Sequence, residues 1–142
     1  MAKYVMKDAY LSVNGSVVSD HVQSLTLEDS AEEIDFTAMS AAGYREIGQG
    51  LKDATVTVTF FGDFAAAPTP IHTILQPLYA SGGTFPVEIR PTSAVVSATN
   101  PKATMTARLF AYSGISGAVG EAATFEAALR NAGTAGLVWG TT

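Results

Sequence analysis

The sequence contains no cysteine among its 142 residues. Disulfide bonds, thiol nucleophiles and thiolate metal sites are therefore excluded together. Charged residues are also scarce, at 15% of the chain against about 25% in a typical soluble domain. A small domain with so few charges and so many Ala, Gly, Ser and Thr residues is consistent with a surface that other subunits cover.

Basic residues are few and scattered. The eight Lys and Arg residues occur singly, and the formal net charge is −5. No basic cluster can neutralise phosphates, which argues against tight binding of DNA or RNA. No stretch approaches the ~20 apolar residues of a membrane span, and residues 1–8 lack the apolar core of a signal peptide. We therefore expect a chain made in the cytoplasm, without membrane contact.

The composition and the strand patterns of the sequence favour a single β-rich domain that spans residues 1–142. Hydrophobic residues make up 47% of the chain, enough for an ordinary core at this length. The clearest strand covers 54–61, where apolar residues alternate with threonines. Asn14-Gly15 between two extended runs predicts a hairpin with a type I′ turn. Similar patterns predict further strands at 22–27, 84–90, 102–110 and 122–130, and residues 137–139 form either a last strand or a tail.

One helix is predicted after Thr69-Pro70. Thr69 can cap the helix and Pro70 suits its first position. An apolar stripe with helical spacing follows, and Pro77 predicts a kink or an early end. Gly82-Gly83 predicts the end of the helix. The stripe consists of Ile71, Ile74, Leu75 and Leu78.

About seven strands and one helix, without internal repeats, define the predicted fold class. It is mainly β: an antiparallel sandwich or barrel with one flanking α-helix. The predicted core includes the aromatic residues of the apolar strand faces, namely Phe60, Phe85, Phe110 and Phe125.

Residues 28–50 interrupt the strand pattern. A connection this long within a compact domain is usually functional or disordered. It is acidic and then Gly-bearing, and we interpret it as an extended hairpin or loop that reaches a neighbour. The carboxylates lack the spacing and the glycine of a calcium loop. Its candidate contact residues are Glu28, Asp29, Glu32, Glu33, Asp35, Tyr44 and Arg45.

No catalytic constellation stands out. The two histidines, His21 and His72, have no carboxylate or second histidine at metal-ligand spacing. No Gly-x-Ser-x-Gly elbow supports a serine hydrolase. We expect His21 in a solvent-exposed turn and His72 on the exposed side of the helix. The sequence therefore predicts no enzyme, no metal and no cofactor.

Polar strand faces rich in threonine are more distinctive. They form either the wet face of a sandwich or a sheet that pairs edge to edge with neighbours, because these strands carry little of the Lys or Pro that usually protects an edge. The residues of this candidate lumen or intersubunit face are Thr55, Thr57, Thr59, Thr104, Thr106, Thr124 and Glu126.

Several segments together resemble siphophage tail tube (major tail) proteins, of the kind found in phages of actinobacteria. The order and spacing of these segments between residues 20 and 135 carry the likeness, since no single one is diagnostic. They are VQSLTLE (22–28), AEEIDFTAM (31–39), GLKDA (50–54), DF (63–64), FPVEIRPTS (85–93) and NPK (100–102).

The resemblance implies a structural subunit of the virion tail, assembled in the host cytoplasm. It implies hexameric rings whose sheets join into a continuous inner barrel, stacked into a hollow tube through which genomic DNA passes without specific binding. Partners would be further copies of the chain, a tape measure protein and tail terminator or tip proteins. Residues 28–50 match a long inter-ring loop by position, and residues 1–7 and 133–142 match terminal arms.

Two sequence observations agree with this hypothesis. Six copies would give about −30 per ring, a field that repels DNA and suits its passage if much of the charge faces inward. A closed ring would also remove the unprotected sheet edges.

The alternatives are another assembly protein derived from phages, such as a head decoration protein or the tube of a contractile injection system, and a β-sandwich binding module. A carbohydrate-binding module should place aromatic residues on an exposed strand face, whereas the aromatic residues here mostly fall on the predicted apolar faces.

Overall fold

The structure, a computed structural model, describes residues 3–40, 43–62 and 70–142. These residues form eight strands, one α-helix and one short 3-10 helix. The elements are β1 (Tyr10–Val13), β2 (Ser16–Val17), η1 (Ser19–His21), β3 (Val22–Asp35), β4 (Ile47–Phe61), α1 (Ile71–Ser81), β5 (Phe85–Arg90), β6 (Lys102–Tyr112), β7 (Thr124–Asn131) and β8 (Val138–Gly140).

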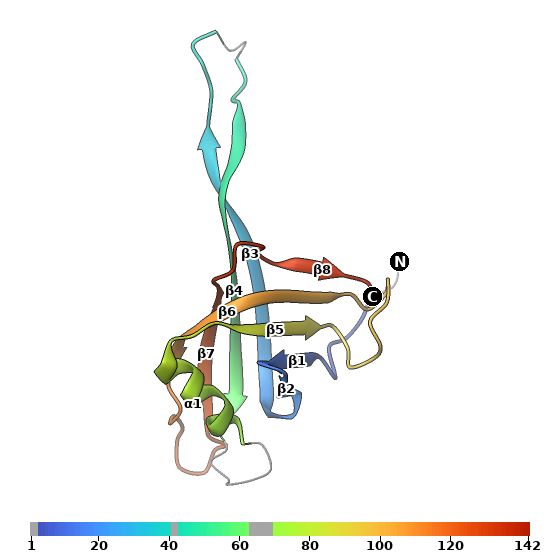
Figure 1. Cartoon of the computed structure of the whole chain (residues 1–142), viewed down its shortest axis with the longest axis vertical. Coiled ribbons are helices and arrows are strands. Elements are labelled where there is room, and N and C mark those ends of the chain that lie inside the picture. The colour runs from blue at the N-terminus through green and yellow to red at the C-terminus, as the bar shows by residue number, and fades with distance from the viewer. Residues whose placement is uncertain (1–2, 41–42, 63–69) are drawn as a thin grey trace.

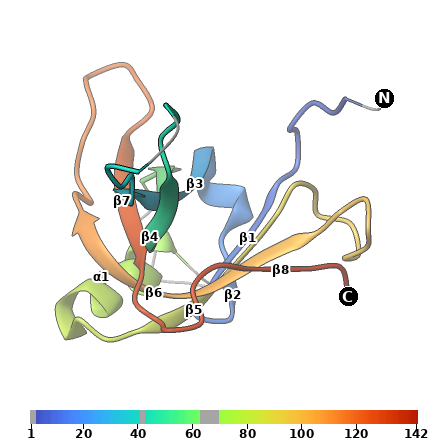
Figure 2. The same cartoon turned by 90° about the horizontal axis from the view of Figure 1, so that it is seen from above.

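All strands belong to one antiparallel sheet with the order β2-β1-β5-β6-β7-β4-β3. The last strand, β8, pairs with the first residues of β6, next to the stretch that pairs with β7. The sheet curls around a single core, with α1 beside it (Figures 1 and 2). The predicted fold class, mainly antiparallel β with one flanking helix, is confirmed, and the sheet is one curled layer with barrel character.

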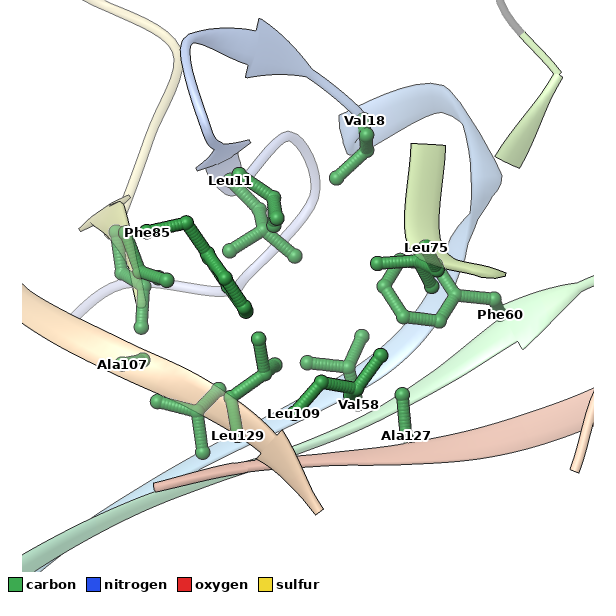
Figure 3. Packing of buried hydrophobic residues seen from close by; sticks show 14 of the residues in the cluster. Leu11, Val18, Val58, Phe60, Leu75, Phe85, Ala107, Leu109, Ala127 and Leu129 are labelled. Atoms are coloured by element: carbon green, nitrogen blue, oxygen red, sulfur yellow. The ribbon is translucent and has the colours of Figure 1, made fainter. Parts of the chain in front are cut away.

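The core lies on the inner face of this sheet. Apolar side chains from β1, β4, β5, β6 and β7 point toward one another and toward Leu75 of α1 (Figure 3). Along β4 the alternation predicted from the sequence is observed, since Val56, Val58 and Phe60 are fully buried. Burial of such side chains stabilises the fold by roughly 1.5–3 kcal/mol each.

The first hairpin and the strand nature of β7 are confirmed. Asn14 and Gly15 have φ of 50° and 81°, as a type I′ turn requires. β7 pairs with both β4 and β6, although its alanine content also suits a helix. Residues 137–139 contribute a strand, β8, rather than a free tail.

The prediction of a buried Phe110 is wrong. Phe110 is the extra residue of a β-bulge, because Leu109 pairs with Leu129 and Ala111 with Ala128. Leu109 is buried, so period-two alternation already places Phe110 on the outer face, where it is 58% exposed. The bulge shifts the alternation only beyond Phe110. Tyr112 takes the inner position and meets the Phe125 ring edge-on, with ring centroids 5.2 Å apart.

The apolar stripe of α1 packs on the sheet as predicted, but the helix does not end early at Pro77. It continues to Ser81, and Gly82 ends it in the left-handed conformation with φ 67°. Pro77 lacks the N–H that would bond to the carbonyl of Thr73. Both residues are exposed, so water can satisfy that carbonyl. Pro70 precedes the first helical residue, and the predicted cap, Thr69, lies outside the described residues.

Leu75→Ala should lower the free energy of unfolding by about 2–5 kcal/mol, because a fully buried leucine leaves a cavity in the core. Urea denaturation followed by circular dichroism measures this change. Tyr79→Ala on the same helix is the control, since Tyr79 is 49% exposed and should cost far less. Equal losses in the two variants would show that α1 is not part of the core.

Candidate functional site

The outer halves of β3 and β4 project from the sheet as a two-stranded arm (Figure 1). The last pair between β4 and β7 joins Thr55 to Arg130, whereas β3 and β4 stay paired out to Asp35 and Ile47. We call residues 28–53 the arm. Every residue of β3 from Glu28 to Asp35 is exposed. Of the two forms expected for residues 28–50, the structure has the extended hairpin.

Two glycines of β4 hold the outer part of the arm together. A Cβ at Gly48 would lie 2.8 Å from Cε2 of Phe36, and one at Gly50 would lie 2.7 Å from Cδ1 of Ile34. The side chains of Ile34 and Phe36 therefore lie across the bare backbone of β4, an approach that only glycine permits. This contact replaces the packing against a core that the arm lacks.

Hydrogen bonds close the hairpin beyond the strands. The amide of Phe36 donates to the carbonyl of Glu46 over 2.8 Å, and the amide of Glu46 donates to Oγ1 of Thr37 over 2.8 Å. The Thr37 amide donates to Oδ1 of Asp35. Hydrogen bonds from Thr37 hold the pKa of Asp35 below its ordinary value, so this carboxylate remains ionised at neutral pH.

An ion pair joins the base of the arm to β7. Nε of Arg130 donates to Oδ2 of Asp53 over 3.0 Å, and a second guanidinium nitrogen donates to the same oxygen. The hydrogen bonds from Arg130 lower the pKa of Asp53, and Asp53 raises that of Arg130. Both side chains are partly solvated, so the ion pair adds little to the free energy of unfolding. Its main effect is to orient the base of the arm relative to β7.

The arm carries the whole net charge of the chain. The residues outside it contain six acidic and six basic side chains, which cancel. Within it, two basic residues leave −5, equal to the charge of the full chain. The seven acidic residues are Glu28, Asp29, Glu32, Glu33, Asp35, Glu46 and Asp53, against Arg45 and Lys52.

All seven candidate contact residues predicted from the sequence lie on the arm and are exposed. They are Glu28, Asp29, Glu32, Glu33, Asp35, Tyr44 and Arg45. Sequence reasoning missed most of the exposed apolar residues of the arm. They lie in the same stretch of sequence and could have been predicted from it. The exposed large apolar side chains that it missed on the arm are Ile34, Phe36, Met39, Ile47 and Leu51.

The candidate sheet face divides into two parts. The residues of β4 and β7 come together on the outer face, with Thr57 beside Thr26 and Ala128, and Thr59 beside Ser24 and Glu126. Their neighbours Thr55 and Thr124 lie in the same two strands. Thr104 and Thr106 pair instead with Glu88 and Pro86 of β5, so they lie farther along the outer face.

The outer edge of β3 has no strand partner among the described residues. β3 pairs with β4 on one side only, over the 14 residues from Val22 to Asp35. It contains neither Pro nor Lys, the residues that commonly protect an edge. Its backbone groups are therefore available to pair with another chain.

The two histidines lie on η1 and α1. His21 is more enclosed than predicted, with 17% of its side chain exposed and Nε2 lying 3.7 Å from Oδ1 of Asp20. His72 is half-buried as well, and its Nδ1 lies 2.5 Å from the hydroxyl of Tyr112. In the part of the chain that the structure describes, no three His, Asp or Glu side chains gather as a metal ion would need. None of its helices could cross a membrane.

Solved structures share this fold over almost the full chain. A chain from the virion of a native gene transfer agent (GTA) particle matches with a TM-score of 0.76 and 14% identity, covering 96% of this chain and 98% of that chain. A chain from the tail of an empty GTA particle, refined with helical and C6 symmetry, matches with a TM-score of 0.68 and 16% identity, covering 94% and 93%. No family model and no curated protein matches the sequence.

Gly50→Val should loosen the arm without affecting the core, because the new side chain displaces Ile34. Faster hydrogen exchange of the amides near Ile34, with an unchanged melting temperature, is the expected result. Gly83→Val is the control, since a Cβ there meets only Oγ of Ser81 at 3.5 Å. Unchanged exchange in the arm would show that the glycine contact does not hold it.

The carboxyl of Asp53 should titrate below the ordinary aspartate pKa of about 3.9. A lowered pKa means that the ion pair is complete above that value and is lost as the pH falls through the folded-state pKa. NMR titration of the carboxyl carbon measures this. Arg130→Gln should return the pKa of Asp53 toward its ordinary value. An unchanged pKa in this variant would show that Arg130 does not cause the lowered pKa.

Proposed function

We propose that this chain is the structural subunit of a phage-type tail tube, which forms hexameric rings stacked around a channel for DNA. The observation that carries the proposal is the full-length likeness of its fold to chains of GTA virion and tail particles. The C6 symmetry of the tail particle favours six copies per ring. The role is structural and requires no catalysis.

The arm suits contact between rings. It extends beyond the sheet, carries exposed apolar and acidic side chains, and contributes nothing to the core. Natural proteins rarely expose so much apolar surface on a projecting element unless a partner covers it. The candidate residues Glu28, Asp29, Glu32, Glu33, Asp35, Tyr44 and Arg45 would lie in this contact.

The free edge of β3 suits contact within a ring. Pairing of this edge with a strand of the next copy would extend the sheet around the ring and remove the unprotected edge. The polar face of β3, β4 and β7 would then line the channel, with Thr57, Thr59 and Glu126 on it. Since the chain outside the arm sums to zero charge, the field in the channel would depend on where the arms lie.

The wider assembly follows from this role. The subunit would reside in the virion tail after assembly in the host cytoplasm. A tape measure protein would set the tube length, and terminator or tip proteins would bind its ends. Siphophage tail tube proteins remain the specific family that the sequence resembles. The termini, residues 1–7 and 133–142, would add contacts between copies.

Negative-stain electron microscopy across a concentration series tests the proposal. The expected result is rings or hollow tubes with a central channel, and particles that stay monomeric with purified tail-tip components present would contradict it. Glu32→Lys combined with Glu33→Lys should abolish tubes while the fold persists by circular dichroism, because both residues are exposed on the arm.

A matched control places the same charge change outside the arm. Asp20→Lys combined with Glu121→Lys also reverses two exposed acidic residues. Tubes should persist in this variant. Loss of tubes in both variants would indicate that net charge, not the arm, controls assembly.

A further inference from the structure

A second free strand edge lies on β6, on the far side of the sheet from the free edge of β3. The pairing of β5 with β6 ends where Phe85 meets Ala107. Beyond that point, residues 108–112 of β6 pair with β7 alone. Among the residues that the structure describes, no strand pairs with the other side of this stretch, and no backbone hydrogen bond joins α1 to it. We call residues 108–112 the open half of β6.

The two free edges lie at the same level along the strands. Two rows of paired residues on the outer face cross β6, β7, β4 and β3 in that order. They are Arg108, Arg130, Thr55 and Glu28, and then Ala111, Ala128, Thr57 and Thr26. A rotation about an axis along the strands therefore brings the open half of β6 in one copy beside residues 25–28 of β3 in the next.

Strand direction selects the open half of β6 as the partner of β3. Because β6, β7, β4 and β3 alternate in direction, β3 and β6 run antiparallel to each other. The rotation keeps these directions, so the joint would be antiparallel like the pairs within the chain. The edges at β2 and β8 run parallel to β3 and have only two and three residues. The edge of β1 is occupied, since Leu11 bonds to Val18 and Ser19.

Arg108 carries a charge that the chain itself does not match. It lies directly opposite Arg130, and like charges in this position destabilise a sheet. Asp53 accepts hydrogen bonds from Arg130. Among the described residues Arg108 forms no ion pair, and neither does Glu28 at the other end of the row. Joining two copies edge to edge brings this arginine and this glutamate together.

The inner side of the joint is apolar. Leu25 and Leu27 of β3 are only half-buried and line an apolar pocket that stays open within one copy. On the open half of β6, Leu109 is buried and Tyr112 packs against the Phe125 ring. Pairing of the two edges places these leucines and Tyr112 on the same face, where cross-strand contacts stabilise a ladder.

We propose that β3 of one copy pairs with the open half of β6 in the next copy, with Arg108 beside Glu28. This inference rests on the proposed function and deepens it, because it names the strand that receives the free edge of β3. The four strands β6, β7, β4 and β3 of each copy then continue into one antiparallel barrel around the ring. A closed barrel staggers its strands, and only shifts by an even number of residues keep the outer faces together.

Disulfide formation between copies tests the pairing, because the chain has no cysteine of its own. Full-length Ala111→Cys combined with Thr26→Cys places two exposed thiols at the two ends of one row. Within one chain they lie three strand spacings apart, roughly 14 Å, which is too far for a disulfide. Across the joint they are neighbours. Ala111→Cys combined with Thr57→Cys is the matched control, since Thr57 is an exposed threonine of the same row, one strand farther from the joint.

Mild oxidation of the Thr26→Cys variant should give covalent multimers up to the full ring, which a reductant separates again. The control should stay monomeric on a denaturing gel. The other outer-face positions of β3 cover the staggered registers, and each is combined with Ala111→Cys in turn: Ser24→Cys, Glu28→Cys and Ser30→Cys.

Two outcomes would overturn the pairing. In the first, no position of β3 crosslinks more than the Thr57→Cys control while the unmodified protein forms rings or tubes, which leaves the proposed function intact. In the second, the unmodified protein forms no rings or tubes and no variant crosslinks, and the proposed function then fails as well.

Reversal of Arg108 tests the charge contact. In the chain with Ala111→Cys and Thr26→Cys, Arg108→Glu sets two carboxylates against each other, so the yield of covalent multimers should fall severalfold. The melting temperature should not fall, because the new carboxylate lies opposite Arg130 of the same chain. Adding Glu28→Arg should restore the yield. An unchanged yield with Arg108→Glu, or no recovery with Glu28→Arg, would overturn the contact between Arg108 and Glu28.

Discussion

The antiparallel pairing of β3 with β4 is the interaction on which the rest of the molecule depends. It begins in the core, where Leu25 pairs with Val58, and continues to Asp35 and Ile47 at the outer end. The inner half is fixed by burial of one face of β4. The outer half has no buried face. It is held by its backbone bonds, by the packing of Ile34 and Phe36 over two glycines, and by side-chain hydrogen bonds of Asp35, Thr37 and Asp53. One ladder therefore links a packed body to an element without a core.

Much of the body could be predicted because its signals are local. Period-two alternation located β4, β5, β6 and β7, and Asn14-Gly15 located the first turn. The outer halves of β3 and β4 escaped the same reasoning, since neither face is buried and no alternation is required of them. The bulge at Phe110 was missed for the opposite reason: the pattern is present, but one inserted residue shifts it.

The candidate site was only partly predictable. An acidic, Gly-bearing stretch indicated an exposed segment, and its seven polar residues do lie together on the arm. The function of Gly48 and Gly50 depends on which residues lie opposite, which is a matter of register. The apolar pocket lined by Tyr4, Leu27 and Trp139 could not be foreseen, because these residues come from the two ends of the chain and from β3, and only tertiary pairing brings them together.

The continuity of β4 also has a mechanical consequence. Hydrogen bonds between antiparallel strands run perpendicular to the strands. A pull along the arm therefore loads the bonds between β4 and β7, from Thr55 to Phe61, in shear, so that they share the force. A sideways push would instead open the ladder pair by pair from the Asp53–Arg130 end. The arm should thus resist tension along its length far better than bending.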